Sequence, residues 1–123
     1  MTTAADLAAS DAHIAMIVAD ASGNVRAWNR GAEEIFGHPA ELALTRRVDL
    51  VVPPAYRDMH WAGFERAIGT AWSGAESWGD IEGLHRDGTL VPLQVLLTPL
   101  RDGDGLVHGV FAMFRRPLPG APV

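Results

Sequence analysis

The residue of this chain with the clearest chemical potential is His60, which lies in the segment PPAYRDMHWAGFERAIGT, residues 53–70. Proline at the start of this segment and glycine-threonine at its end favour a single helix across it. Tyr56, His60, Phe64 and Ile68 recur every four residues, so they share one mostly apolar face of that helix. An imidazole on such a face either forms a hydrogen bond within the core or binds a ligand there, and the spacing alone supports both roles.

The chain offers no second set of residues suited to catalysis or metal binding. It contains no cysteine, which excludes disulfides, thiolate metal sites and cysteine nucleophiles. The other histidines lack the paired spacing of a zinc site, and no Ser-His-acid order, phosphate-binding glycine loop or matched carboxylate pair is present. Residues 102–105, DGDG, resemble the start of a calcium loop without its downstream glutamate, so we expect a hairpin turn there. We expect no enzymatic activity.

Length, composition and charge indicate one folded domain. A chain of 123 residues can form one core but not two. Hydrophobic residues make up 48% of the chain and charged residues 20%, which argues against disorder. The net charge of −5 argues against a nucleic-acid or anionic membrane partner, and no apolar run approaches the ~20 residues of a membrane span. Because the N-terminus also lacks the features of a signal peptide, we expect a cytoplasmic protein.

The pattern along the chain predicts strands, then helices, then strands. Two apolar runs, Ile14 to Ala19 and Val25 to Trp28, flank turn-forming residues and predict a hairpin. The stretch from Asn29 to Gly37 begins with a helix-capping residue and ends with a helix-terminating one. Short helices are expected before the long helix at residues 53–70, and three strands separated by turns are expected between residues 71 and 116.

The last two strands show which residues share a face. Alternation places Leu93, Val95 and Leu97 on one face of the longer strand. In the final strand, Phe111 and Met113 also share a face, and we expect it to be the face that lines the interior.

This order of elements predicts an α+β fold with a five-stranded antiparallel sheet, and with short helices and one longer helix on one face of it. Such a fold resembles the PAS sensory domain. The stretch from residue 17 to 53, including Asp20, Gly23 and Asn29, is similar to the first half of that family. The sequence HRDGTLVPLQVLLTPL, residues 85–100, resembles its later strand entry, and the resemblance covers residues 12–116. It implies a signal-transduction domain that passes its signal to a partner or output domain, such as the kinase of a two-component system.

The run P-x-Y-R-x-x-H from Pro54 to His60 is similar to that of the haem-binding PAS domains of FixL-type oxygen sensors. There the histidine is the proximal iron ligand, so the resemblance implies haem b held through His60 and a diatomic gas or redox state as the signal. Arg66 matches a basic residue that lies near a haem propionate in that family. The cofactor-binding residues implied by the resemblance are Tyr56, Met59, His60, Phe64, Arg66, Trp78, Leu93, Val95, Leu97, Phe111 and Met113.

The chain departs from those oxygen sensors on the distal side of the cofactor. Their arginine that reaches toward bound oxygen corresponds here to Gly79, and the neighbouring Trp78 is the candidate replacement donor through its indole N–H. Two other functions stay open, a cofactor-free module that dimerises with His60 as a core residue, and a pocket for an apolar metabolite. A flavin adduct would need a cysteine that this chain lacks.

The expected organisation is an N-terminal cap helix or flanking segment at residues 1–11, the domain at residues 12–116 and a linker at residues 117–123. The N-terminal helix and one sheet face are the expected surfaces of a homodimer. Trp28, Trp61 and Leu96 are further candidates for contact with that helix or with a second subunit.

Overall fold

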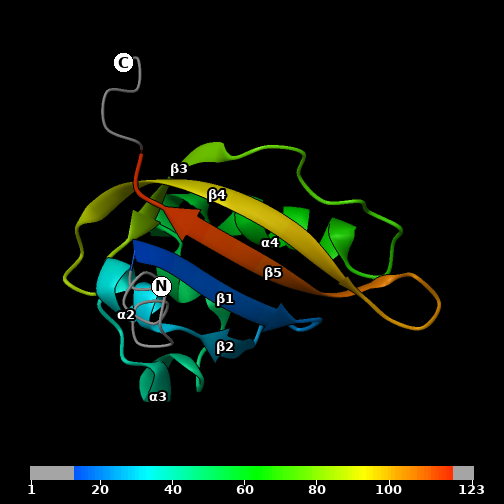
Figure 1. Ribbon diagram of the computed structural model, residues 1–123, viewed down its shortest axis with the longest axis horizontal. Helices are drawn as coiled ribbons and strands as arrows, with labels where there is room; N and C mark the ends of the chain where they lie inside the picture. The colour runs from blue at the N-terminus through cyan, green and yellow to red at the C-terminus, as the bar shows by residue number, and fades with distance from the viewer. Residues whose placement is uncertain (1–12, 118–123) are drawn as a thin grey trace, which may run out of the picture.

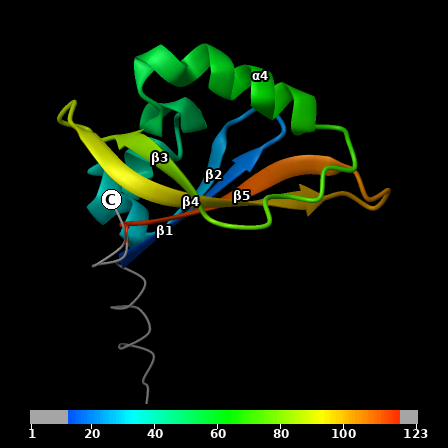
Figure 2. The same ribbon diagram turned by 90° about the horizontal axis from the view of Figure 1, so that it is seen from above.

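The computed structural model describes residues 13–117, which form a twisted antiparallel sheet with helices along one face (Figures 1 and 2). The predicted N-terminal helix and nearly all of the predicted C-terminal linker lie outside the described residues. The strands are β1 (Ile14–Asp20), β2 (Val25–Trp28), β3 (Gly79–Leu84), β4 (Leu90–Arg101) and β5 (Val107–Arg115). The helices are α2 (Arg30–Phe36), α3 (Ala40–Ala43), η2 (Val48–Val51), η3 (Pro54–Tyr56) and α4 (Arg57–Ala67).

The strands are arranged in the order β2-β1-β5-β4-β3, and every neighbouring pair is antiparallel. The chain therefore places its first and last strands, β1 and β5, side by side at the centre. This arrangement confirms the predicted α+β fold with five antiparallel strands and its predicted hairpins.

Asn29 joins the first hairpin to α2. Its Oδ1 accepts hydrogen bonds from the backbone N–H of Ala32 (2.9 Å) and of Met16 (2.8 Å), and its Nδ2 donates to the carbonyl of Ile14 (2.9 Å). One side chain thus caps the helix and extends the pairing with β1. The helix ends as predicted at Gly37, whose φ of 81° is a left-handed conformation that glycine adopts without strain.

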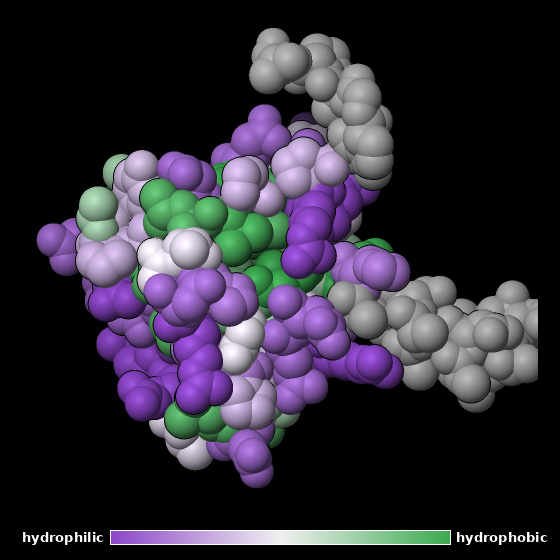
Figure 3. Space-filling model, turned by 90° about the vertical axis from the view of Figure 1, so that its left-hand side faces the viewer, coloured by the Kyte–Doolittle hydropathy of each residue, from purple (hydrophilic) through white to green (hydrophobic). Residues whose placement is uncertain are grey.

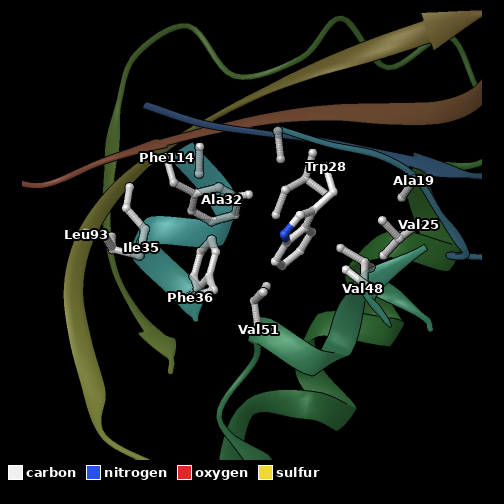
Figure 4. Packing of buried hydrophobic residues seen from close by; sticks show 14 residues of the cluster. Ala19, Val25, Trp28, Ala32, Ile35, Phe36, Val48, Val51, Leu93 and Phe114 are labelled. Carbon is white, nitrogen blue, oxygen red and sulfur yellow. The ribbon is translucent and has the colours of Figure 1, made fainter. Parts of the chain in front are cut away.

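The packed core lies between α2 and the inner face of the sheet (Figure 4). Phe36 contacts Phe114 edge to face with ring centroids 5.2 Å apart, and Leu93 is 1% exposed beside them. Trp28 is only 7% exposed, and its Nε1 donates to the carbonyl of His38 (2.9 Å). The indole therefore fills the core, and the expectation that Trp28 contacts a second subunit is wrong. The alternative, contact with an N-terminal helix, lies outside the described residues.

The predicted long helix is shorter than the sequence suggested. Residues 54–56 form the 3₁₀ turn η3, and α4 then runs from Arg57 to Ala67. Ile68 has an extended backbone (ψ 134°), so it does not continue the face formed by Tyr56, His60 and Phe64. The two prolines disfavour α-helical geometry at Val52 and Pro53, which explains why no helix begins before Pro54.

Replacing Asn29 tests this junction. We expect Asn29→Ala to lower the free energy of unfolding by about 2 kcal/mol, since it removes a helix cap and two further hydrogen bonds. Asn29→Ser should lose less, because serine can cap α2 but cannot reach both groups of β1. Urea unfolding followed by tryptophan fluorescence measures both values, and equal losses in the two variants would contradict the dual role.

Candidate functional site

A cavity of about 1090 Å³ separates α4 from the inner face of the sheet. None of the residues of α4 is buried, although the helix lies across the sheet (Figure 2). Most of the surface of the cavity is apolar. Its walls are formed by Ile17, Ala19, Val48, Val51, Val52, Pro53, Tyr56, Met59, His60, Gly63, Phe64, Arg66, Ala67, Thr70, Trp72, Asp80, Ile81, Glu82, Val95, Leu97, Val110, Ala112 and Phe114.

The floor of the cavity follows from strand register. Ala112 of β5 pairs with Ile17 of β1 on one side and with Leu97 of β4 on the other. Phe114 pairs with Val95 in the same way. Directly paired residues point to the same face of a sheet, so these side chains form one continuous apolar surface facing α4.

His60 projects from α4 to the cavity wall, packed against aromatic neighbours. Its ring centroid lies 4.7 Å from that of Trp61 and 6.2 Å from that of Phe64. Among the described residues its Nδ1 is buried and has no hydrogen-bond partner. A buried ring nitrogen without a partner costs about 1–3 kcal/mol, so the geometry does not fit a hydrogen-bonded core histidine.

The surroundings of His60 favour its neutral form. Burial is the main cause that lowers its pKa below the ordinary value of 6.5, and the Arg47 guanidinium lowers it further. The Asp49 carboxylate opposes these two effects in part. At neutral pH the imidazole is therefore uncharged and retains a lone pair for a ligand.

Polar and flexible side chains border the opening of the cavity. Tyr56 is 46% exposed and Met59 is 70% exposed, and both line it from the start of α4 and the turn before it. Arg66, in the last turn of α4, lines the other end of the cavity and is exposed. The site thus combines an apolar interior with a cationic group at its rim.

The structure brings seven of the predicted site residues to this cavity, which are Tyr56, Met59, His60, Phe64, Arg66, Val95 and Leu97. Leu93 shares the inner face but belongs to the packed core instead. Phe111 and Met113 do share a face, as predicted, but it is the outer one, because they alternate with Ala112 and Phe114. The expectation that these two residues line the interior is wrong.

Trp78 also lies away from the cavity. Its ring stacks against the Arg115 guanidinium, 4.0 Å from the ring centroid, and Arg115 donates from Nε to Gln94 on the outer face (3.0 Å). Gly79 follows it opposite Val95, and a Cβ at Gly79 would meet no atom within 4 Å. The position that corresponds to the arginine of the oxygen sensors, Gly79, therefore borders open space, and the candidate donor Trp78 does not reach the cavity.

Sequence reasoning missed Trp72 and Ile81, which also line the cavity. Trp72 follows α4 in an irregular segment, where no periodicity indicates a direction. Ile81 pairs with Leu93 across β3 and β4, so strand alternation from Leu93 could have identified it once the register was known.

Trp61 anchors α4 to the rest of the domain. Its Nε1 donates to Asp49 (3.2 Å), and the Arg47 guanidinium lies 3.8 Å from its ring centroid. A Cβ at Gly23 would collide with its ring, so the indole occupies the space above that turn. The predicted contact of Trp61 with an N-terminal helix or another subunit stays a prediction.

The described residues contain neither a cluster of metal-binding side chains nor a membrane-spanning helix. In residues 13–117 no cluster of three or more His, Asp or Glu side chains is arranged to hold a metal ion. A haem iron needs only one histidine from the protein, so this result concerns ions bound by side chains alone. No helix in this part of the chain has the length and apolar character needed to span a membrane.

A sequence profile described as the PAS fold matches residues 7–117 of the chain. An uncharacterised protein of Azorhizobium caulinodans is 32% identical over 99 residues, which cover 79% of this chain and 14% of that protein. The chain therefore spans about one seventh of the length of this relative.

Solved structures show the same fold. The PAS domain of a Colwellia psychrerythraea protein superposes with a TM-score of 0.73 at 20% identity, over 94% of this chain and 98% of that one. A light-oxygen-voltage domain studied with a flavin analogue gives a TM-score of 0.65 at 17% identity, over 97% and 88% of the two chains. The PAS domain of the fruit-fly ELK potassium channel gives 0.65 at 10% identity, over 93% and 97%.

The lowered pKa of His60 predicts a specific pH dependence of stability. Between the folded-state pKa and 6.5 the unfolded chain binds more protons, so the free energy of unfolding falls as pH decreases through this window. We expect His60→Phe to flatten this slope between pH 7 and 5, by at most about 1.4 kcal/mol per pH unit. Urea unfolding at several pH values measures it.

Phe64→Leu is the matched control, because it alters the same cavity wall without removing the imidazole. It should lower stability at every pH and keep the slope of the unmodified protein. A slope unchanged by His60→Phe would contradict the assigned protonation state.

Proposed function

This chain belongs to the PAS-fold family, and since it is a sensory domain of that family, we propose that it binds a small molecule in the cavity beneath α4. The observation that carries this proposal is an apolar cavity of about 1090 Å³ with one neutral, unpaired imidazole in its wall. Small-molecule sites typically have about 300–1,000 Å³, mostly apolar walls and few polar groups. The cavity is slightly larger than the upper end of that range.

Haem b is the ligand that we propose for it, with His60 as the iron ligand. Three features fit this group: the large apolar volume, the neutral histidine and Arg66 at the rim, which suits a propionate carboxylate. One feature fits less well, because Nδ1 of His60 lacks the hydrogen-bond acceptor that iron-ligating histidines normally have. A bound haem iron would supply reversible binding of a diatomic gas or a change of redox state.

The protein's own residues would supply selectivity and exclude water. Val95, Leu97 and Ala112 present an apolar wall with no hydrogen-bond donor, opposite the helix that carries His60. Gly79 stands where the oxygen sensors carry an arginine, and the space beside it is open, so no arginine from this position would donate a hydrogen bond to a bound gas. We expect a haem-bound form to favour ligands that need little hydrogen bonding, such as carbon monoxide, over oxygen.

Other ligands of this cavity are outcomes of the same test. Light-oxygen-voltage domains share the fold, but this chain has no cysteine to form a flavin adduct. A flavin held without a covalent bond or an apolar metabolite would fill the same apolar volume. Native mass spectrometry of the purified protein identifies either one by its mass.

An absorption spectrum tests the haem proposal. The protein produced with haem available should show a Soret band, and His60→Ala should abolish or strongly shift this band while the protein stays folded by circular dichroism. Free imidazole added to the His60→Ala protein should restore the spectrum in part, because it can replace the missing ligand in the cavity.

His108→Ala is the control, since His108 is exposed and does not line the cavity. It should leave the spectrum unchanged. A folded protein without a Soret band, or a band that His60→Ala leaves intact, would remove His60 from this role.

We also propose self-association through the outer face of the sheet. Val18, Leu96, Phe111 and Met113 lie together there by register, and each is partly exposed. A second copy of the chain could cover these apolar side chains, and the central strands β1 and β5 would then connect the cavity floor to the partner or output domain. Leu96 thus keeps its predicted role as an interface residue.

Replacement of Phe111 tests this interface. We expect Phe111→Glu to weaken dimerisation at least tenfold, because it places a charge in an apolar contact. Sedimentation velocity across a dilution series measures the dissociation constant. Leu44→Glu, at a hydrophobic residue that is 45% exposed at the end of α3, is the control and should have no effect. A protein that is monomeric at every concentration would contradict the interface.

A further inference from the structure

A second, smaller cavity of about 430 Å³ lies on the other side of the η2 segment and is surrounded by arginine side chains. It is lined by His38, Arg46, Arg47, Asp49, Leu50, Arg57, Leu84, His85 and Arg86. Four of the ten arginines of the chain converge here, although the chain carries a net charge of −5. They come from three separate regions, the loop before η2, the start of α4 and the turn between β3 and β4.

These arginines lack carboxylate partners. In residues 13–117 the one ion pair between an arginine and a carboxylate joins Arg26 to Asp20, so none of the four arginines of this cavity takes part in one. The single carboxylate of the lining, Asp49, already accepts a hydrogen bond from Trp61. Four positive charges brought together with a single carboxylate repel one another, and a bound anion would relieve this repulsion.

Backbone hydrogen bonds hold two of these arginines in place. Arg47 donates from Nε (3.2 Å) and Nη2 (3.0 Å) to the carbonyl of Ser22 and stacks on Trp61. Arg57 donates from Nε to the carbonyl of Val52 (3.1 Å). Each guanidinium has five N–H donors, so both retain donors for a ligand. Arg46 and Arg86 form no side-chain hydrogen bond to a described residue, and their guanidinium groups are exposed.

Two imidazoles extend the donor set. The Nδ1 of His38 is buried and has no hydrogen-bond partner among the described residues. Burial lowers the pKa of His38, and Arg86, His85 and Arg46 lower it further through their positive charge. The Nδ1 of His85 accepts from the backbone N–H of Asp87 (3.1 Å), which leaves Nε2 as its donor nitrogen. His85 is packed against Gly37, next to His38.

We propose that this cavity is a binding site for a phosphate group of a small phosphorylated molecule. Guanidinium forks match phosphate oxygens in pairs, and arginines from several segments can contact one phosphate from different sides. The volume exceeds that of a single phosphate, and Leu50 and Leu84 offer apolar contact to an attached organic portion. Figure 3 views the end of the molecule where the β3–β4 turn lies, and hydrophilic side chains gather there around a smaller apolar area.

This site is independent of the haem proposal, because none of its residues lines the cavity that contains His60. Inorganic pyrophosphate is the probe, since it carries the phosphate chemistry without an organic portion. Isothermal titration calorimetry at low ionic strength should show saturable binding of one pyrophosphate per chain, with an affinity that falls as salt is added. Sulfate at equal ionic strength should bind more weakly.

The variant Arg46→Gln/Arg86→Gln should weaken this binding at least tenfold, because it removes two exposed guanidinium groups without touching the core. Arg30→Gln is the matched control, since Arg30 is exposed and lies outside the cavity. It should bind pyrophosphate as the unmodified protein does. Absence of saturable heat, or equal weakening in both proteins, would overturn the site.

Proton NMR of the histidine rings gives a second measurement that does not depend on a variant. The resonances of His38 and His85 should shift on addition of pyrophosphate, while that of the exposed His108 should not. The charged groups around His38 are Arg46, Arg47, Asp49, Arg57, His85 and Arg86, with Asp87 beside His85. An anion would offset their net positive charge, so the pKa of His38 should rise. Equal shifts in all three histidines would also overturn the proposal.

Discussion

The pairing register of β1, β5 and β4 determines what each side of this domain can do. It places Ile17, Ala112 and Leu97 in a row on the inner face, and successive residues of each strand must then point to the outer face. A shift of one residue would exchange the two surfaces completely. The apolar cavity wall and the apolar outer face, which includes Phe111, therefore depend on the same set of backbone hydrogen bonds.

The cavity exists because the two helices that cover the inner face of the sheet pack against it differently. Helix α2 is packed onto the sheet through Phe36, whereas α4 buries none of its residues. α4 is held from its other side, where Trp61 contacts Asp49 and the Arg47 guanidinium. A helix anchored in this way can cover a volume without filling it, which leaves His60 in the wall of a ligand-sized space.

The Arg47 guanidinium also connects the two cavities physically. It lines the smaller basic cavity and stacks on Trp61. It also lowers the pKa of His60, the residue before Trp61 in α4. An anion held in the basic cavity would act on the same guanidinium that holds α4. The fold thus places a basic cavity and an apolar cavity on opposite sides of the η2 segment.

The sequence alone determined the elements, because turn residues, caps and periodicity act over a few neighbouring residues. Asn29 and Gly37 bounded α2, and the strand alternation separated Leu96 from Val95 and Leu97. It also identified His60 as an inward imidazole. Only the tertiary structure decided which face of β5 meets the cavity, so Phe111 and Met113 were assigned to the wrong side.

Tertiary structure also decided every contact between distant segments. Trp28 and Trp61 look alike in sequence as large aromatic residues, yet one fills the core and the other anchors α4. The arginines of the basic cavity are up to 40 positions apart, from Arg46 to Arg86, and no local pattern connects them. Periodicity states which residues of one element share a face, but only the packing of several elements determines what that face meets.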